Sequence, residues 1–182
     1  MDITFNQLFL GVIFFTIIQR IGELFWSKRN EKYLLSEGAK IIYEPNYIFM
    51  VLLHTSWLAS ILICAIFQPK EISPLIFMIS VIIFVLGQFL RLSAIMTLGK
   101  RWSTKIVVLP QAPLVTNGLF KIIRHPNYLG VVLEIVALPL MGGYWKLALF
   151  FSIANFTILY FRIRLEEKML DQYNGYYKEF SK

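Results

Sequence analysis

The stretch ISPLIFMISVIIFVLGQFL, residues 72–90, holds 19 residues without one Asp, Glu, Lys or Arg. A helix of about 20 apolar residues is long enough to cross the hydrocarbon core of a bilayer. Similar runs lie on both sides of this one, at residues 3–19, 45–68, 126–145 and 147–161, and Glu134 is the single Asp, Glu, Lys or Arg among them. The sequence therefore predicts an all-α, polytopic membrane protein with about five transmembrane helices.

The composition supports a membrane class. Hydrophobic residues make up 57% of the chain and charged residues 16%, whereas a soluble domain carries about 25% charged residues. The first apolar run lacks the basic start and the cleavage site of a signal peptide, so we expect it to remain as a helix. A lone cysteine, Cys64, leaves no pair for an internal disulfide.

Basic residues are distributed unevenly among the predicted connections. Fourteen Lys and Arg residues lie after the first and third spans and at the C-terminal end. The second and fourth connections hold only Lys70 and Lys146, and we assign Arg20 and Arg91 to helix ends. The positive-inside rule then predicts an N-terminus outside and a C-terminus in the cytoplasm. Topology and contacts with anionic lipids account for the net charge of +7, and no nucleic-acid-binding motif accompanies it.

The third connection, Thr97–His125, is unusually long at 29 residues. Connections between bundle helices usually take about 2–8 residues, and long ones are often functional. This one is apolar and β-branched in places and is interrupted by Pro110, Pro113 and Gly118. It either lies on the lipid headgroups or forms the wall of a cytoplasmic pocket, and its length and composition favour the pocket wall. We expect residues 1–96 and 97–182 to form two regions.

Ionisable residues inside predicted spans are candidates for function. Glu134 either pairs with Arg91 or faces a pocket, and a structural role is slightly favoured. His54 stands alone on an apolar helix, where a hydrogen-bonded structural histidine is the simpler interpretation. No cluster of His, Cys or carboxylates has the spacing of metal ligands, so we expect no metal site.

The end of the fifth run, FRIRLEEKML, places Arg162 and Glu166 four residues apart on one helix face. An ordinary interfacial charge pair would explain them. A five-span topology, however, brings this helix end to the same side of the membrane as the polar stretch RHPNY, Arg124–Tyr128. That juxtaposition favours a functional site.

Three ordered blocks of the sequence together resemble the isoprenylcysteine carboxyl methyltransferase family of membrane enzymes. They are LVTNGLF (Leu114–Phe120), RHPNYLG (Arg124–Gly130), and the Arg162, Glu166–Glu167 and Leu170 pattern followed by a Tyr-rich tail. The resemblance covers about residues 97–180, which would then be the catalytic region. The stretch GKRWSTKIVVLPQAPLV resembles more closely a small bacterial subgroup whose acceptor is the hydroxyl of an alkylpyrone-like polyketide lipid.

The resemblance implies an S-adenosylmethionine-dependent O-methyltransferase, in a bacterial plasma membrane, with a lipophilic acceptor and an active site facing the cytoplasm. It implies a catalytic role for Arg162, towards the acceptor, and for Glu166. The cofactor-binding residues that it implies are Ala112, Pro113, Leu114, Val115, Phe120, His125, Pro126, Asn127, Tyr128 and Glu166. Phe120 departs from the pattern, because relatives often carry a tyrosine there.

The residues are compatible with this chemistry. Methyl transfer from an activated donor needs alignment and exclusion of water more than acid–base help. An acceptor that is a carboxylate or an acidic enol is already ionised at neutral pH, and Arg162 could hold its oxygen by charge-assisted hydrogen bonds. The use of a general base is left open.

Two other functions are considered. An NADPH-dependent membrane reductase of the sterol-reductase type shares a similar R-H-x-x-Y pattern, but such chains are about twice as long and carry a basic cluster for the 2′-phosphate. A non-catalytic membrane scaffold that keeps the last helical hairpin is the second alternative.

Overall fold

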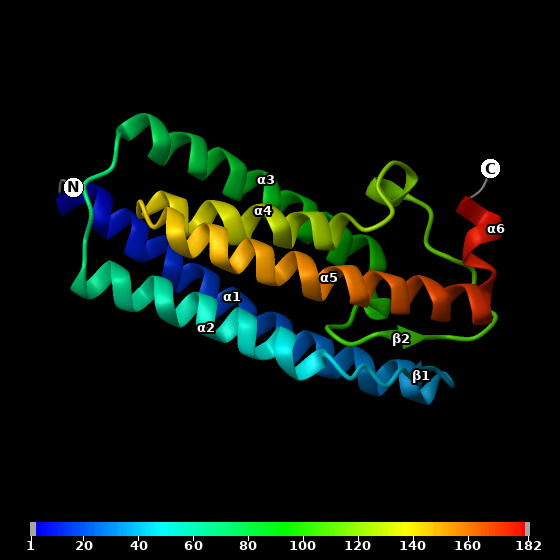
Figure 1. The fold of residues 1–182 in the computed structure, drawn as a ribbon. Helices are drawn as coiled ribbons and strands as arrows, with labels where there is room; N and C mark the ends of the chain where they lie inside the picture. The colour runs from blue at the N-terminus through cyan, green and yellow to red at the C-terminus, as the bar shows by residue number, and fades with distance from the viewer. Residues whose placement is uncertain (1–2, 181–182) are drawn as a thin grey trace.

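The computed structural model describes residues 3–180 as a bundle of long helices that run alongside one another (Figure 1). The long helices are α1 (Ile3–Ser36), α2 (Tyr47–Phe67), α3 (Pro74–Leu98), α4 (Pro126–Met141) and α5 (Trp145–Asn174). The short elements are β1 (Lys40–Ile41), η1 (Gly99–Arg101), β2 (Val107–Val108), η2 (Gly118–Lys121) and α6 (Tyr176–Phe180).

The predicted all-α membrane fold is confirmed. Within residues 3–180, four helices (α1, α2, α3 and α5) are long and apolar enough to cross a bilayer, while α4 has 16 residues. At about 1.5 Å per residue α4 is about 24 Å long, somewhat less than the hydrocarbon core. Large apolar side chains on the bundle surface, such as Phe15, Phe49 and Phe150, are more than half exposed, as expected for a surface that contacts lipid. The chain is an integral membrane protein.

Helix α1 continues well beyond its apolar run, which ends at Gln19. The following residues include no proline and many good helix formers, so the helix extends to Ser36. The assignment of Arg20 and Arg91 to helix ends is therefore wrong, because Arg20 lies in the middle of α1 and Arg91 lies seven residues before the end of α3. The long α5 ends at Gly175, whose φ of 68° is the left-handed conformation typical of a residue following a helix.

The connections alternate between the two ends of the bundle. The first and third connections and the C-terminus lie at one end, which we call the loop end, and the N-terminus lies at the other (Figure 1). At the loop end, β1 and β2 pair antiparallel, with Lys40 opposite Val108 and Ile41 opposite Val107. This pairing ties the first connection to the third, which runs from Gly99 to His125.

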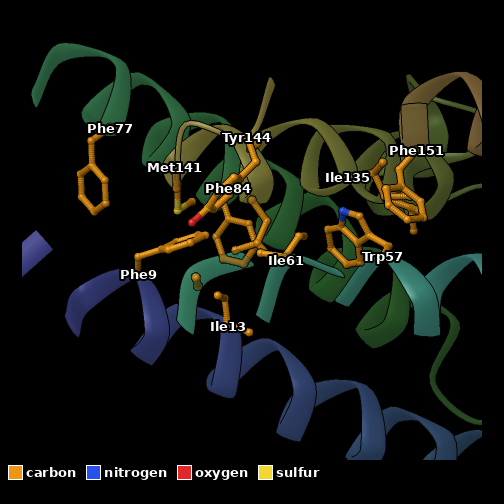
Figure 2. Close-up of a cluster of buried hydrophobic side chains, with 14 of the residues drawn as sticks. Phe9, Ile13, Trp57, Ile61, Phe77, Phe84, Ile135, Met141, Tyr144 and Phe151 are labelled. Carbon is orange, nitrogen blue, oxygen red and sulfur yellow. The ribbon is translucent and has the colours of Figure 1, made fainter. Parts of the chain in front are cut away.

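The apolar core lies towards the N-terminal end of the bundle. Helices α1 to α5 each contribute to it, with the segment that joins α4 to α5 contributing Tyr144 (Figure 2). The labelled side chains are Phe9, Ile13, Trp57, Ile61, Phe77, Phe84, Ile135, Met141, Tyr144 and Phe151. Since this end is filled by large side chains, the polar groups of the bundle gather in its other half.

Helices α3 and α4 approach each other closely at Gly87 and Gly130. A Cβ atom added at Gly130 would lie 2.6 Å from the Gly87 carbonyl oxygen and 2.6 Å from Arg91 Cγ. A Cβ at Gly87 would lie 2.9 Å from the Gly130 carbonyl oxygen. Glycine at these positions lets two backbones touch, a common arrangement between membrane helices.

We expect Gly130→Ala to lower the free energy of unfolding by about 1–3 kcal/mol, because the new methyl group forces α3 and α4 apart. Gly22→Ala is the matched control, since nothing lies within 4 Å of its added Cβ. That change should be neutral or stabilise the helix by up to about 1 kcal/mol. Thermal unfolding of both variants in one detergent measures the difference, and equal midpoints would contradict the close approach.

Candidate active site

The RHPNY stretch forms the start of α4 at the loop end. Pro126 is the first helical residue, where its fixed φ suits a helix and its missing N–H removes no hydrogen bond. His125 is the residue that caps the helix, and Asn127 and Tyr128 lie in the first turn. The RHPNY stretch thus places three polar side chains at the loop end.

Tyr128 joins the two motifs on which the sequence analysis relied. Its hydroxyl accepts a hydrogen bond from Arg162 Nε at 2.9 Å and donates one to Glu166 Oε2 at 2.5 Å. Tyr128, Arg162 and Glu166 are therefore brought together, although they lie 34 and 38 residues apart in the chain. The i, i+4 pair on α5 does not meet directly, because the tyrosine hydroxyl lies between the two side chains.

Arg162 is held by residues that the sequence analysis did not identify. Its guanidinium is 4% exposed, and one terminal nitrogen donates to both carboxylate oxygens of Glu44, at 2.8 and 2.6 Å. The other donates to the Thr104 carbonyl at 2.7 Å. Glu44 lies outside the recognised motifs, and Thr104 lies in the GKRWSTKIVVLPQAPLV stretch but had been given no role. An acidic residue directly before Pro45, where the second apolar run begins at the loop end, was the available signal for Glu44.

The environment of Glu44 favours its neutral form more than water would. Burial raises the pKa of this carboxyl group above its ordinary value, and the charge of Arg162 offsets the rise only in part. The charge of Glu166, a carboxylate that lies on α5, raises the pKa of Glu44 further. Glu44 is thus a carboxylate that accepts a proton more readily than an exposed one.

His125 forms a second contact between α4 and α5. Its Nε2 lies 3.1 Å from Glu167 Oε1, and its ring stacks on Tyr128 with the centroids 5.4 Å apart. The Tyr176 ring lies 6.5 Å from the same imidazole. Glu167 was part of the recognised pattern, but only its neighbour Glu166 had been assigned a role.

The other predicted cofactor residues lie at the loop end but contact different partners. Asn174 at the end of α5 donates to the carbonyl of Ala112, at 2.8 Å, and the carbonyl of Pro113 accepts from Arg101 at 2.5 Å. Leu114 and Val115 follow as a half-buried segment without regular structure. Phe120 lies in η2, which packs against α3. Ala112 thus contacts the end of α5, Pro113 contacts η1, and the short helix that carries Phe120 contacts α3.

The second half of α1 holds the third connection in place through hydrogen bonds. The Ser27 hydroxyl accepts from the Thr104 backbone N–H at 2.9 Å, and Glu31 accepts from Ser103 and from Lys105, each at 3.0 Å. The hydrogen bond to Glu31 raises the pKa of Lys105 above its ordinary value. Because the Thr104 carbonyl binds Arg162, this support reaches the candidate site.

A separate group of charges lies inside the bundle, two turns along α4. Glu134 is fully buried and pairs with Arg20 and with Arg91, and Arg91 also pairs with Glu23. Gln88 on α3 accepts from the Gln19 side chain at 2.8 Å beside them. The pairing of Glu134 with Arg91 is confirmed, while Arg20 and Glu23 were missed. His54, as predicted, is hydrogen-bonded locally, to the Met50 carbonyl at 2.8 Å.

A groove of about 320 Å³ lies between α4 and α5. Polar side chains form one part of its wall and apolar side chains the rest. Its lining is His125, Tyr128, Leu129, Val132, Phe156, Leu159, Tyr160, Ile163, Arg164 and Glu167. Within residues 3–180, no group of three or more His, Cys, Asp or Glu side chains is placed to hold a metal ion.

Comparisons with known proteins agree on one family. The isoprenylcysteine carboxyl methyltransferase (ICMT) family matches residues 78–172. An uncharacterised protein of Bacillus subtilis, YpbQ, is 33% identical over 92% of this chain and 99% of its own length. Protein-S-isoprenylcysteine O-methyltransferase B of Arabidopsis thaliana is 32% identical over 50% of this chain and 47% of its own. The enzyme of the same name from Schizosaccharomyces pombe is 31% identical over 66% and 51%. No solved structure matches significantly.

Proposed function

This chain belongs to the isoprenylcysteine carboxyl methyltransferase family and is a membrane O-methyltransferase, and from that premise we propose a donor and an acceptor. The donor is S-adenosylmethionine. The acceptor is a lipophilic molecule with an acidic oxygen, either the hydroxyl of an alkylpyrone-like lipid or a prenylcysteine-type carboxylate. The observation that carries the proposal is the cluster of Tyr128, Arg162 and Glu166 beside an amphiphilic groove.

The residues around Tyr128 fit the proposed donor. Asn127 Oδ1 is buried and has no hydrogen-bond partner within residues 3–180, so it is free to accept from an ammonium or hydroxyl group of a ligand. The stacked rings of His125 and Tyr128 offer aromatic faces to a sulfonium cation, a contact of about 0.5–2 kcal/mol. Glu166 and Glu167 add acceptors. S-adenosylmethionine, when bound, supplies a methyl group already activated on sulfur.

The same proposal gives roles to the remaining predicted residues. Pro126 starts the helix that carries Asn127 and Tyr128. Ala112, Pro113, Leu114, Val115 and Phe120 line the outer side of the cofactor site. Their position at the loop end, in the same connection as Thr104, supports this role.

On the acceptor side, Arg162 binds the reacting oxygen and the groove between α4 and α5 takes the apolar tail. The groove supports this because its apolar wall is formed by α5, which is long and apolar enough to cross a bilayer, and by the shorter apolar helix α4. A buried guanidinium holds an ionised acceptor oxygen by charge-assisted hydrogen bonds and so fixes its direction of approach to the methyl group. Alignment of the two reactants and exclusion of water do the remaining work.

We further propose that the loop end faces the cytoplasm of a bacterial plasma membrane, with the N-terminus outside. The excess of Lys and Arg at this end supports the orientation. Residues 97–182 form the catalytic region, and residues 1–96 supply three supporting helices together with Glu44.

Titration of the detergent-purified protein with S-adenosylmethionine and with NADPH tests the donor. We expect saturable binding of S-adenosylmethionine only. Binding of NADPH alone would support the reductase, and binding of neither would support the scaffold. With labelled donor, we expect methyl transfer to a long-chain hydroxypyrone or to a prenylcysteine, and no transfer to either would contradict the proposal.

A further inference from the structure

Arg162 is electrically neutralised before any acceptor arrives. Its buried guanidinium pairs with the Glu44 carboxylate through two hydrogen bonds, and Tyr128 and the Thr104 carbonyl take further donors. A guanidinium has five N–H donors, so little of this group remains free. The pair as a whole carries no net charge.

This neutral pair suits a neutral acceptor better than one that is already an anion. A second negative group beside Arg162 would lie close to the Glu44 carboxylate, and like charges in a buried site repel strongly. A neutral hydroxyl brings no such repulsion, and it can donate its hydrogen to a carboxylate.

We propose that Glu44 is the proton acceptor of the methyl transfer when the acceptor is a neutral hydroxyl, and that the site therefore takes such acceptors at physiological pH in addition to the acidic ones proposed above. The acceptor O–H bond breaks and its proton moves to a Glu44 carboxylate oxygen. The electron pair left on the acceptor oxygen forms the new O–CH₃ bond as the donor's S–CH₃ bond breaks, with the sulfur keeping that bond pair. Protonated Glu44 no longer neutralises Arg162, whose charge then stabilises the developing oxyanion.

The surroundings of Glu44 support this role. Glu44 lies outside the part of the chain that matches the family, so the inference adds to what the family match supplies. Arg162 and Glu166 on α5 are the charged groups that act on it most strongly, and burial raises the pKa of Glu44.

The other side chains around the Glu44–Arg162 pair are consistent with proton transfer to Glu44. Tyr128 on α4 contacts Arg162, and Tyr47 at the start of α2 lies 3.4 Å from the Thr104 hydroxyl. Lys105, next to Thr104, pairs with Glu31 instead. The Met50 sulfur lies 3.4 Å from Arg162, and rotation of this flexible side chain would admit an acceptor oxygen.

The inference rests on the proposed function, and two acceptors with the same alkyl chain test it. One is a phenol, whose hydroxyl has a pKa of about 10 and is neutral at pH 7. The other is a 4-hydroxy-2-pyrone, which is ionised at pH 7. We expect the wild-type protein to methylate both. Glu44→Gln should lower kcat/KM for the phenol by about 100-fold or more, as loss of a general base does, and for the pyrone by less than about tenfold.

The ratio of the two rates is the deciding measurement, because both acceptors are assayed with one preparation and loss of folded protein cancels. Glu44→Asp keeps a carboxylate and should give a phenol-to-pyrone ratio between those of wild type and Glu44→Gln. If Glu44→Gln yields no active protein, the aspartate variant decides, and a wild-type ratio there overturns the inference. Glu37→Gln, an exposed carboxylate of the same connection, should leave the ratio unchanged.

Other outcomes separate this inference from the proposed function. An equal loss on both acceptors in Glu44→Gln would mean a structural role for Glu44 and would overturn the inference. So would a wild-type protein that methylates the pyrone or a prenylcysteine but never the phenol, which leaves the proposed function intact. A protein that methylates none of the three acceptors overturns both.

Discussion

Arg162→Ala is expected to reduce methyl transfer by about 100-fold or more, because the acceptor oxygen is no longer held in line with the methyl group. Arg162 binds the Glu44 carboxylate, the Thr104 carbonyl of the third connection and the Tyr128 hydroxyl. Its removal therefore also leaves the buried Glu44 without a countercharge. Rates with labelled S-adenosylmethionine, at saturating donor and varied acceptor, measure the effect.

Arg162→Lys should be nearly as damaging. A lysine ammonium is a compact charge on a flexible stem and cannot reproduce a planar fork that donates in three directions. Lys168→Ala, an exposed position on the same helix, serves as the control and should keep turnover close to wild type. Turnover close to wild type in Arg162→Ala would remove Arg162 from the acceptor site.

Glu134→Leu is expected to lower the free energy of unfolding by about 3–5 kcal/mol, the usual cost of breaking a buried ion pair from one side. Glu134 is fully buried and pairs with both Arg20 and Arg91. Without it, two arginines share the single carboxylate of Glu23 inside the bundle. Thermal unfolding in detergent should show a large decrease in the midpoint.

A double variant distinguishes charge balance from packing. Arg91→Met combined with Glu134→Leu removes one charge of each sign and should recover part of the stability lost in Glu134→Leu alone. Glu37→Gln, on the exposed surface, is the matched control and should change stability by less than about 0.5 kcal/mol. If Glu134→Leu behaved like this control, the buried network would not stabilise the fold.

Much of the architecture could be predicted because the bilayer constrains it. The lengths of the apolar runs predicted the helices, and the alternation of Lys and Arg predicted which connections share an end. Because successive helices alternate in direction, RHPNY and the end of α5 lie at the same end of the bundle. Tyr128, Arg162 and Glu166 were therefore correctly grouped. The length of α1 was less predictable, because its second half carries many charged residues, and its contacts with the third connection depend on the tertiary fold.

The partners of the charged residues could not be predicted, because a pairing depends on the rotation of each helix and on the path of the connections. Arg162 and Glu166 have the spacing of a direct pair, yet Tyr128 from α4 lies between them. Arg91 was given one partner and has two, because α1 turns Glu23 towards α3.

By itself the sequence determined that this protein is a membrane bundle with a methyltransferase-like end, since hydrophobic length and ordered motifs are local properties of the chain. Only the tertiary structure decided which carboxylate neutralises Arg162. Glu44 reaches it across 118 residues of sequence because the pairing of β1 with β2 and the start of α2 hold the first connection against α5. Such contacts follow from packing between distant segments, and no local pattern in the chain encodes them.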